Sequence, residues 1–259
     1  MLSSLLSEVQ RRAADAGLNL FGLVDADRFD AAQTKERRVR TLAPNCGTVL
    51  VIGSGGRRLW QQFARASESA GCHAACNVDR YALDVVRTVD GILDRARIGA
   101  RTVPAGCSTR LPFAQLAEAA GLGTVSPVTG LLLHPEYGPW VRIRAVVLAD
   151  GRPFGPIADA SISSHFHPCC GCSRPCVAAC PVGVHDGGGS PDLQRCAEHR
   201  DEGNCETYCQ SRSACPIGSE HRDAAGEYAH GHSHPLRAMR RWFGLGVWRW
   251  VPTSWRGRP

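Results

Sequence analysis

The chain lacks long apolar runs and any sign of a secretion signal. No stretch approaches the roughly 18 consecutive apolar residues of a membrane-spanning helix, so we expect no transmembrane segment. The first residues, MLSSLLSEVQRRAADAG, lack the basic-then-apolar order of a signal peptide, and we expect a cytoplasmic protein. Disulfide bonds are rare in that compartment. The 13 cysteines must therefore serve a different purpose, and metal binding is the first candidate.

Acidic residues are absent from residues 235–259, which hold six arginines and four of the six tryptophans. Without this stretch the chain has 24 basic and 24 acidic residues, so the net charge of +6 belongs to the C-terminal end. Lys35 is the single lysine, and the other arginines are scattered, which does not by itself indicate nucleic-acid binding. We expect residues 223–259 to form a basic tail that binds a membrane surface, RNA or an acidic protein. The alternative is a helix whose tryptophans pack on the body.

Hydrophobic periodicity divides the remainder into two parts. Through residues 1–163, helical patterns (2–16, 59–69, 78–97, 111–120) are interspersed with strand patterns (19–24, 48–52, 129–133, 141–148). This predicts a sheet covered by helices. Residues 164–222 hold nine cysteines and almost no apolar periodicity, so this segment needs an inorganic group to hold it together.

The cysteines of the second part form two runs that each end in Cys-Pro. The first run, from Cys169 to Cys180, is spaced C-x2-C-x3-C-x3-C-P, one residue longer than the bacterial ferredoxin run. In two-cluster ferredoxins the fourth cysteine of each run serves the other cluster. Applied here, that rule predicts two [4Fe–4S] clusters, one held by Cys169, Cys172, Cys176 and Cys215, the other by Cys180, Cys196, Cys205 and Cys209.

Zinc binding and disulfide bonding are the alternatives to clusters at these cysteines. Structural zinc also uses C-x2-C pairs, although two runs ending in Cys-Pro fit zinc poorly. A disulfide framework conflicts with the missing signal peptide and with the odd number of cysteines. Two clusters need eight cysteine ligands, so Cys170 is not required. Only the spacing favours Cys169 over Cys170 as the ligand.

Residues 111–218 resemble the cobalamin-dependent reductases, that is, epoxyqueuosine reductase and the reductive dehalogenases. The resemblance rests on the order of Ala120-Gly-Leu-Gly123, His134-Pro-Glu-Tyr-Gly138, the cysteine runs and Asp192-Leu-Gln-Arg-Cys196. It implies an α+β fold: a nitroreductase-like, cobalamin-binding-type core with a ferredoxin-like double [4Fe–4S] domain. It also implies cofactor contacts at Gly121 and Gly123, and a reduced ferredoxin or flavodoxin as electron donor.

Further candidate site residues lie in the core. Tyr137 and Arg142 are candidates for substrate contact, the alternatives being a Tyr packed at a turn and an Arg on an exposed edge. Cys107 lies near the position of the acidic proton donor of epoxyqueuosine reductase and could donate a proton, unless it is a buried structural cysteine. Gly53 and Gly55 follow a strand and could cradle a phosphate or a cofactor tail, unless they form a plain turn.

Two functions follow from these patterns. The first is an iron–sulfur oxidoreductase that passes low-potential electrons through two clusters to a cofactor, with cobalamin as the candidate, or to a substrate in the core. The second is a non-catalytic two-cluster electron carrier or accessory subunit that has lost cobalamin binding. The absence of Asp and Glu from residues 104–110 favours the second, and the retained turns favour the first. A zinc-stapled nucleic-acid binder would be colourless, whereas both of these would be brown.

Overall fold

The centre of the molecule is a four-stranded antiparallel sheet. The structure is a computed structural model that describes residues 2–69, 77–106, 110–157 and 166–256. The strand order is β1-β2-β6-β3, and all three neighbouring pairs are antiparallel. The strands are β1 (Leu20–Asp25), β2 (Cys46–Gly55), β3 (Ala100–Pro104) and β6 (Val141–Asp150). A smaller sheet pairs β4 (Thr124–Val125) with β5 (Leu132–Leu133).

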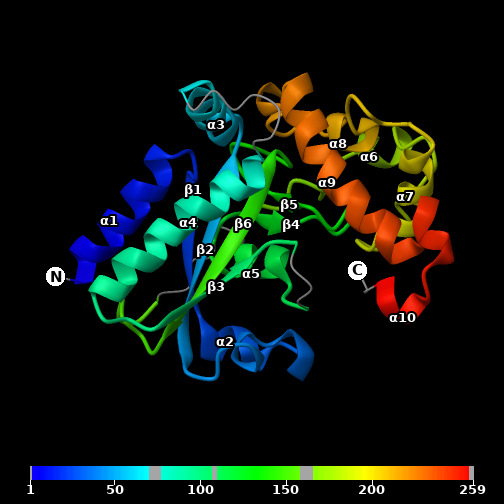
Figure 1. Ribbon diagram of the computed structural model, residues 1–259. Coiled ribbons are helices and arrows are strands. Elements are labelled where there is room, and N and C mark those ends of the chain that lie inside the picture. Colours follow the sequence, from blue (N-terminus) through cyan, green and yellow to red (C-terminus); the bar gives the residue numbers. More distant parts are fainter. Residues whose placement is uncertain (1, 70–76, 107–109, 158–165, 257–259) are drawn as a thin grey trace.

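Helices cover both faces of the large sheet (Figure 1). On one face lie α1 (Leu2–Asp15), α3 (Arg58–Ser69) and α4 (Val78–Arg95), packed on Leu50 and Ile52 of β2. On the other lie α2 (Ala26–Ala31) and α5 (Phe113–Ala119), packed on Val49 and Val51. Because successive side chains of a strand point to opposite faces, the unbroken apolar run of β2 serves both cores. The expected α+β core is present; the strand expected over 129–133 is limited to β5.

The cysteine segment follows the core and contains only short helices. They are α6 (Pro175–Ala178), α7 (Leu193–Asp201), α8 (Gln210–Ser213) and the 3-10 turn η4 (Ser219–His221). Two 3-10 turns also occur in the core, η1 (Lys35–Arg37) and η2 (Val39–Thr41). Loops make up the remaining described residues of the segment, as expected for a part of the chain without apolar periodicity.

The C-terminal region begins as a long helix packed on the rest of the molecule. It comprises α9 (Ala225–Phe243), η5 (Gly246–Trp250) and α10 (Thr253–Arg256). Tyr228 and Met239 of α9 are buried, and the Tyr228 hydroxyl donates to the Cys205 carbonyl at 3.0 Å. Trp250 and Trp255 are 83% and 73% exposed. The region is thus anchored by α9 and exposes tryptophan only beyond it. No helix in the described part of the chain is long and apolar enough to cross a membrane.

Candidate metal centre

Eight cysteines of the cysteine segment line two cavities, four to each. The first cavity, of about 40 Å³, is lined by Cys169, Cys172, Cys176 and Cys215. The second, of about 380 Å³, is lined by Cys180, Cys196, Cys205 and Cys209. Each cavity therefore combines cysteines of both runs: Cys215 joins the first run and Cys180 joins the second. Cys170 is exposed and lines neither of these cavities.

The thiols in these cavities are close enough to influence one another. Burial raises the pKa of Cys176 and Cys215, and the neighbouring sulfurs of the first group raise it further. Burial likewise raises the pKa of Cys196 and Cys205, with a further contribution from Cys209 and Cys180. Binding of any thiophilic metal would thus displace protons from these thiols.

Four thiols line each cavity, which is the donor set of a [4Fe–4S] cluster and also of a structural zinc ion. Among the described residues, no three His, Cys, Asp or Glu side chains are arranged to hold one metal ion. Zinc–sulfur bonds are about 2.3 Å long, so the four thiolates of a zinc site surround one ion closely. Each thiolate of a [4Fe–4S] cluster binds a different iron and lies farther from the centre of the cluster. A [4Fe–4S] cluster therefore needs its four thiols spaced more widely than a zinc ion does.

Backbone and hydroxyl groups point at the sulfurs. The backbone N–H of Arg174 donates to Cys172 Sγ at 3.4 Å, and that of Arg212 donates to Cys209 Sγ at 3.5 Å. Ser126 Oγ lies 3.3 Å from Cys169 Sγ. Hydrogen bonds to thiolate sulfur stabilise the more negative, reduced state of an iron–sulfur cluster and so raise its potential.

A thin wall separates the two cavities. Four residues line both of them: Thr129, Leu131, Ser211 and Arg212. The Arg212 guanidinium lies 4.3 Å from the centre of the Trp140 ring and donates twice to the Pro139 carbonyl, at 3.0 and 2.8 Å. Arg212 therefore ties this wall to the chain just before β6, and two groups bound in the cavities would be neighbours.

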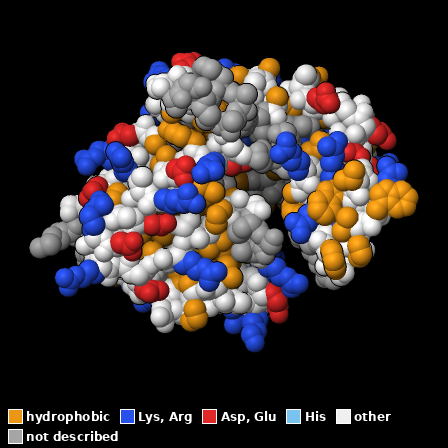
Figure 2. Space-filling model, in the orientation of Figure 1, with side chains coloured by type: hydrophobic (Ala, Val, Ile, Leu, Met, Phe, Trp, Pro, Cys, Tyr) orange, Lys and Arg blue, Asp and Glu red, His pale blue; other side chains and the backbone are white. Residues whose placement is uncertain are grey.

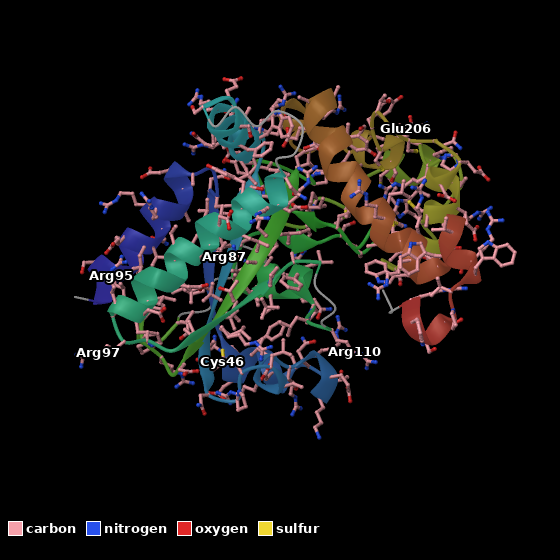
Figure 3. The ribbon with its side chains drawn as sticks, viewed as in Figure 1. Cys46, Arg87, Arg95, Arg97, Arg110 and Glu206 are labelled. Carbon is pink, nitrogen blue, oxygen red and sulfur yellow. The ribbon has the colours of Figure 1, made fainter. Side chains whose placement is uncertain are left out.

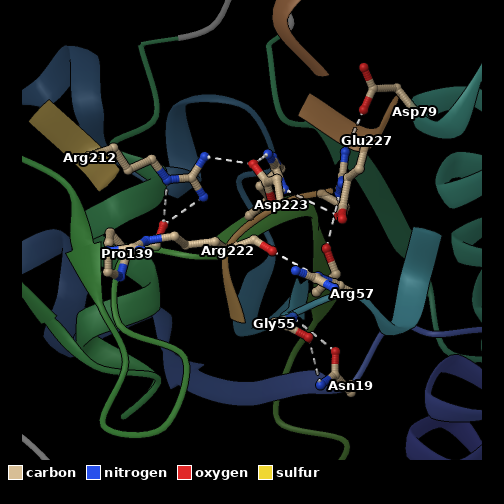
Figure 4. Close-up of polar contacts among 12 residues, drawn as sticks. Asn19, Gly55, Arg57, Asp79, Pro139, Arg212, Arg222, Asp223 and Glu227 are labelled. Carbon is tan, nitrogen blue, oxygen red and sulfur yellow. Dashed lines mark hydrogen bonds and ion pairs between the residues drawn. The ribbon is translucent and has the colours of Figure 1, made fainter. Parts of the chain in front are cut away.

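Arg142 belongs to a buried network of charges (Figure 4). Its guanidinium donates to both carboxylate oxygens of Asp223, which also accepts from Arg212, and it lies 3.8 Å from Glu227. The side chains of Asp223 and Glu227 are 3% and 7% exposed. Burial and the nearby Arg142 lower the pKa of Arg212 to about 10, which still leaves it charged at neutral pH. Arg142 lines the second cavity but is held by carboxylates; its contact with a substrate stays a prediction.

The pH dependence of stability should report on Glu227. Burial raises the pKa of its carboxyl, and one of its oxygens has no hydrogen-bond partner in the described chain. A raised acid pKa means that folding favours the protonated form, so ionisation at neutral pH costs stability. We expect Glu227→Gln to raise the free energy of unfolding at pH 7, with the gain vanishing below about pH 4, where the unfolded carboxyl is protonated too. Urea unfolding across this range measures it; a gain independent of pH would contradict it.

Tyr137 packs inside the turn between β5 and β6. Its ring stacks on His134 and meets His221 edge-on, each with ring centres 4.8 Å apart. Its hydroxyl accepts from Asn19 Nδ2 at 3.2 Å. A substrate role for Tyr137 stays a prediction, and its observed contacts match the alternative of a Tyr packed at a turn.

Gly53 and Gly55 lie inside β2, before the point where a phosphate loop would begin. A Cβ on Gly55 would come within 2.2 Å of the Tyr137 ring, so glycine allows that ring to lie on the strand. The Gly55 N–H donates to Asn19 Oδ1 at 2.9 Å and is not free for a phosphate. A cofactor contact of these two glycines stays a prediction.

Gly121 and Gly123 shape the turn after α5. Gly121 has φ of +72° just past the helix end, and a Cβ on Gly123 would lie 2.2 Å from the Leu133 carbonyl oxygen. Beyond them, Ser126 Oγ accepts from two N–H groups of its own loop and Thr129 Oγ1 accepts from the Leu131 N–H. Within the described loop these two hydroxyl oxygens accept from the loop's own backbone. A cofactor contact of Gly121 and Gly123 stays a prediction.

The turn carrying Tyr137 touches the end of the second cysteine run. Gly138 has φ of +54°, and a Cβ there would lie 1.9 Å from the Ile217 carbonyl oxygen. Gly218 has φ of +63°, and a Cβ there would lie 2.4 Å from the Tyr137 carbonyl carbon. Two glycines thus let the backbones of core and cysteine segment approach directly, next to Cys215.

Gly138→Ala should destabilise the protein by more than its backbone angle alone explains. We expect a loss of about 3 kcal/mol or more, of which the left-handed conformation contributes about 1–2 kcal/mol. Gly183→Ala is the matched control, since its φ is +57° and a Cβ there meets nothing within 4 Å. Denaturant unfolding compares the two variants, and equal losses would show that the close approach at Gly138 contributes nothing.

Among the described residues of the core, Cys46 is a cysteine that stands apart from this centre. Cys107 lies outside the described residues, so its role as a proton donor stays a prediction. Cys46 is fully buried beside α2, away from the cysteine segment (Figure 3), and burial raises the pKa of its thiol to about 12.

Comparison with known proteins gives relatives by structure alone. No protein-family model matches the chain, and no curated protein matches it by sequence. Among solved structures, an epoxyqueuosine reductase with a tRNA-Tyr stem loop superposes with a TM-score of 0.61 at 17% identity, over 99% of this chain and 78% of that one. The Bacillus subtilis epoxyqueuosine reductase gives 0.60 at 18% identity, over 99% and 78%.

Reductive dehalogenases form the second group of neighbours. A catabolic reductive dehalogenase in complex with 3-bromo-4-hydroxybenzoic acid gives a TM-score of 0.54 at 15% identity, over 95% of this chain and 37% of that one. A structure described in terms of B12-dependent dehalogenation gives 0.54 at 16% identity, over 90% and 34%. Both groups are those that the sequence resembles. The chain therefore has the fold shared by epoxyqueuosine reductases and reductive dehalogenases.

Proposed function

We propose that the protein is an iron–sulfur oxidoreductase with two [4Fe–4S] clusters, one in each four-cysteine cavity. The observation that carries the proposal is the crosswise grouping of the two cysteine runs around two hollows, which is how two-cluster ferredoxins distribute their ligands. When bound, an iron–sulfur cluster accepts and releases single electrons at a potential set by its surroundings. The residues 164–222 would then be the electron-transfer domain and residues 1–163 the domain that receives the electrons.

The chain's own residues have three roles in this proposal. The eight cysteines hold the two groups, and the N–H groups of Arg174 and Arg212 direct partial positive charge at their sulfurs. Leu131 and Ser211 in the shared wall keep the cavities adjacent, which suits electron passage between them. The physiological donor would be a reduced ferredoxin or flavodoxin, and the acceptor a substrate or a cofactor in the core, with cobalamin the candidate that the resemblance implies.

A non-catalytic electron carrier is the second candidate. The specific observation in its favour is the loop after Gly123, where Ser126 Oγ and Thr129 Oγ1 accept hydrogen bonds from backbone N–H groups of the loop itself. The two candidates differ in what the core binds, not in the clusters.

Anaerobic reductive titration followed by cofactor loading separates the candidates. Reconstituted protein should take up about two electrons per chain from dithionite, one per cluster. A corrin spectrum that survives desalting after incubation with hydroxocobalamin would favour the oxidoreductase, and complete loss of corrin would favour the carrier. A protein that accepts no electrons would contradict both.

A further inference from the structure

The C-terminal lobe, residues 237–256, exposes large apolar side chains beside several arginines. Val247 and Trp250 in η5 are 79% and 83% exposed, and Trp255 in α10 is 73% exposed. Residues three apart on a 3-10 helix lie on one face, so Val247 and Trp250 project together. Figure 2 shows hydrophobic side chains gathered on this lobe. Such an apolar group, rimmed by charge, marks an interaction surface.

The arginines of the lobe keep their charge. Arg249 and Arg256 donate to backbone carbonyls of the lobe itself, and Arg241 donates to the Trp255 carbonyl. These hydrogen bonds stabilise the fold of the lobe but do not neutralise the charge of its arginines, because backbone carbonyls carry no net charge. Residues 235–259 contain no acid, and Asp201 of α7 pairs with one of their arginines, Arg240, so the lobe carries a net positive charge.

A groove of about 330 Å³ opens beneath the exposed side chains. Val247, Trp248 and the guanidinium-bearing Arg237 and Arg240 line it, together with Asp201 of α7. Arg240 is paired with Asp201. Arg237 is exposed and has no hydrogen bond or ion pair among the described residues. Within the described chain, the groove thus offers an unpaired guanidinium next to apolar side chains, a combination suited to a phosphate group attached to an apolar chain.

We propose that this lobe docks the protein on the surface of an anionic phospholipid bilayer. Trp250, Trp255 and Val247 would enter the headgroup region, where tryptophan is favoured, while Arg237 would meet a lipid phosphate. An aliphatic Val beside the Trp favours a bilayer over nucleic acid, because Val247 offers no ring on which a base could stack. The docking surface is independent of the cluster proposal and would place the cysteine segment, which packs on α9, near the membrane.

Co-sedimentation with vesicles tests the proposal. The full chain should bind phosphatidylcholine vesicles containing phosphatidylserine, bind phosphatidylcholine alone far more weakly, and dissociate as salt rises. Trp250→Ala should weaken binding roughly tenfold or more, since it removes the most exposed ring. Arg237→Gln should weaken it about fivefold. Both positions are exposed, so both variants should fold.

Matched controls and alternative outcomes make the test decisive. Tyr208→Ala removes an exposed ring of the cysteine segment, and Arg11→Gln removes an exposed arginine of α1; neither should change vesicle binding. Failure to bind anionic vesicles, or equal losses in variants and controls, would overturn the proposal. So would loss of RNA stem-loop binding or of self-association in Trp250→Ala without any vesicle binding, since the surface would then serve that partner.

Discussion

The double variant Cys169→Ser/Cys215→Ser should retain about four of about eight irons per chain, whereas Cys169→Ser/Cys180→Ser should retain none. In the structure Cys169 and Cys215 line one cavity, so removing both destroys one cluster only. Cys180 lines the other cavity, so the second pair destroys both. Iron content and visible absorption of the reconstituted proteins measure the result.

The opposite outcome is expected if each run holds its own cluster in sequence order. Cys169 and Cys180 would then share a cluster, and the two double variants would exchange their iron contents. Cys170→Ser is the control for cysteine substitution as such, because Cys170 is exposed and should leave all the iron in place. Loss of iron in Cys170→Ser would instead exchange the roles of Cys169 and Cys170.

Asp223→Ala should lower the free energy of unfolding by about 3–5 kcal/mol. The carboxylate is 3% exposed and accepts from two guanidinium groups, those of Arg142 and Arg212. Removing one partner of a buried ion pair leaves an uncompensated charge in a poorly solvated place, which costs far more than the pair itself contributes. Because the two arginines come from β6 and α8, the loss should also loosen the cysteine segment from the core.

An exposed ion pair supplies the matched control. Asp84 pairs with Arg87 on α4, with side chains 53% and 68% exposed. Asp84→Ala should change stability by less than about 1 kcal/mol. Denaturant unfolding of the two variants under one condition tests this, and similar losses would mean that the network around Asp223 is not a structural anchor.

Local patterns in the sequence predicted the main elements of the core. β2 contains a buried apolar run, β6 begins with alternating apolar and polar residues, and α3 and α4 carry an apolar stripe, so periodicity identifies all four. β3 was not predicted, because it is an edge strand with Val103 as its buried residue and Pro104 at its end. The two sets of cysteines that the ferredoxin rule assigns to two clusters each line one cavity, and their binding of clusters stays a prediction.

Contacts between residues far apart in the chain could not be predicted from local sequence patterns. Nothing local indicates that Arg142 meets Asp223, which lies 81 residues further on, and the sequence suggested a substrate or an exposed edge for that arginine. Gly55 follows a strand pattern in a way typical of a phosphate loop, yet the ring of Tyr137 occupies the space beside it. Tertiary packing determines the contacts of Arg142 and of Gly55. It also determines how the cysteine segment packs on the core.

Iron and acid-labile sulfide content, with electron paramagnetic resonance of the dithionite-reduced protein, decides whether the cysteine segment holds two clusters. We expect about eight irons and about eight sulfides per chain, a brown protein, and signals from two reduced [4Fe–4S] clusters close enough to interact. A colourless protein that holds zinc and gives no such signal would contradict the proposal of two clusters. The cysteine segment would then have a structural role.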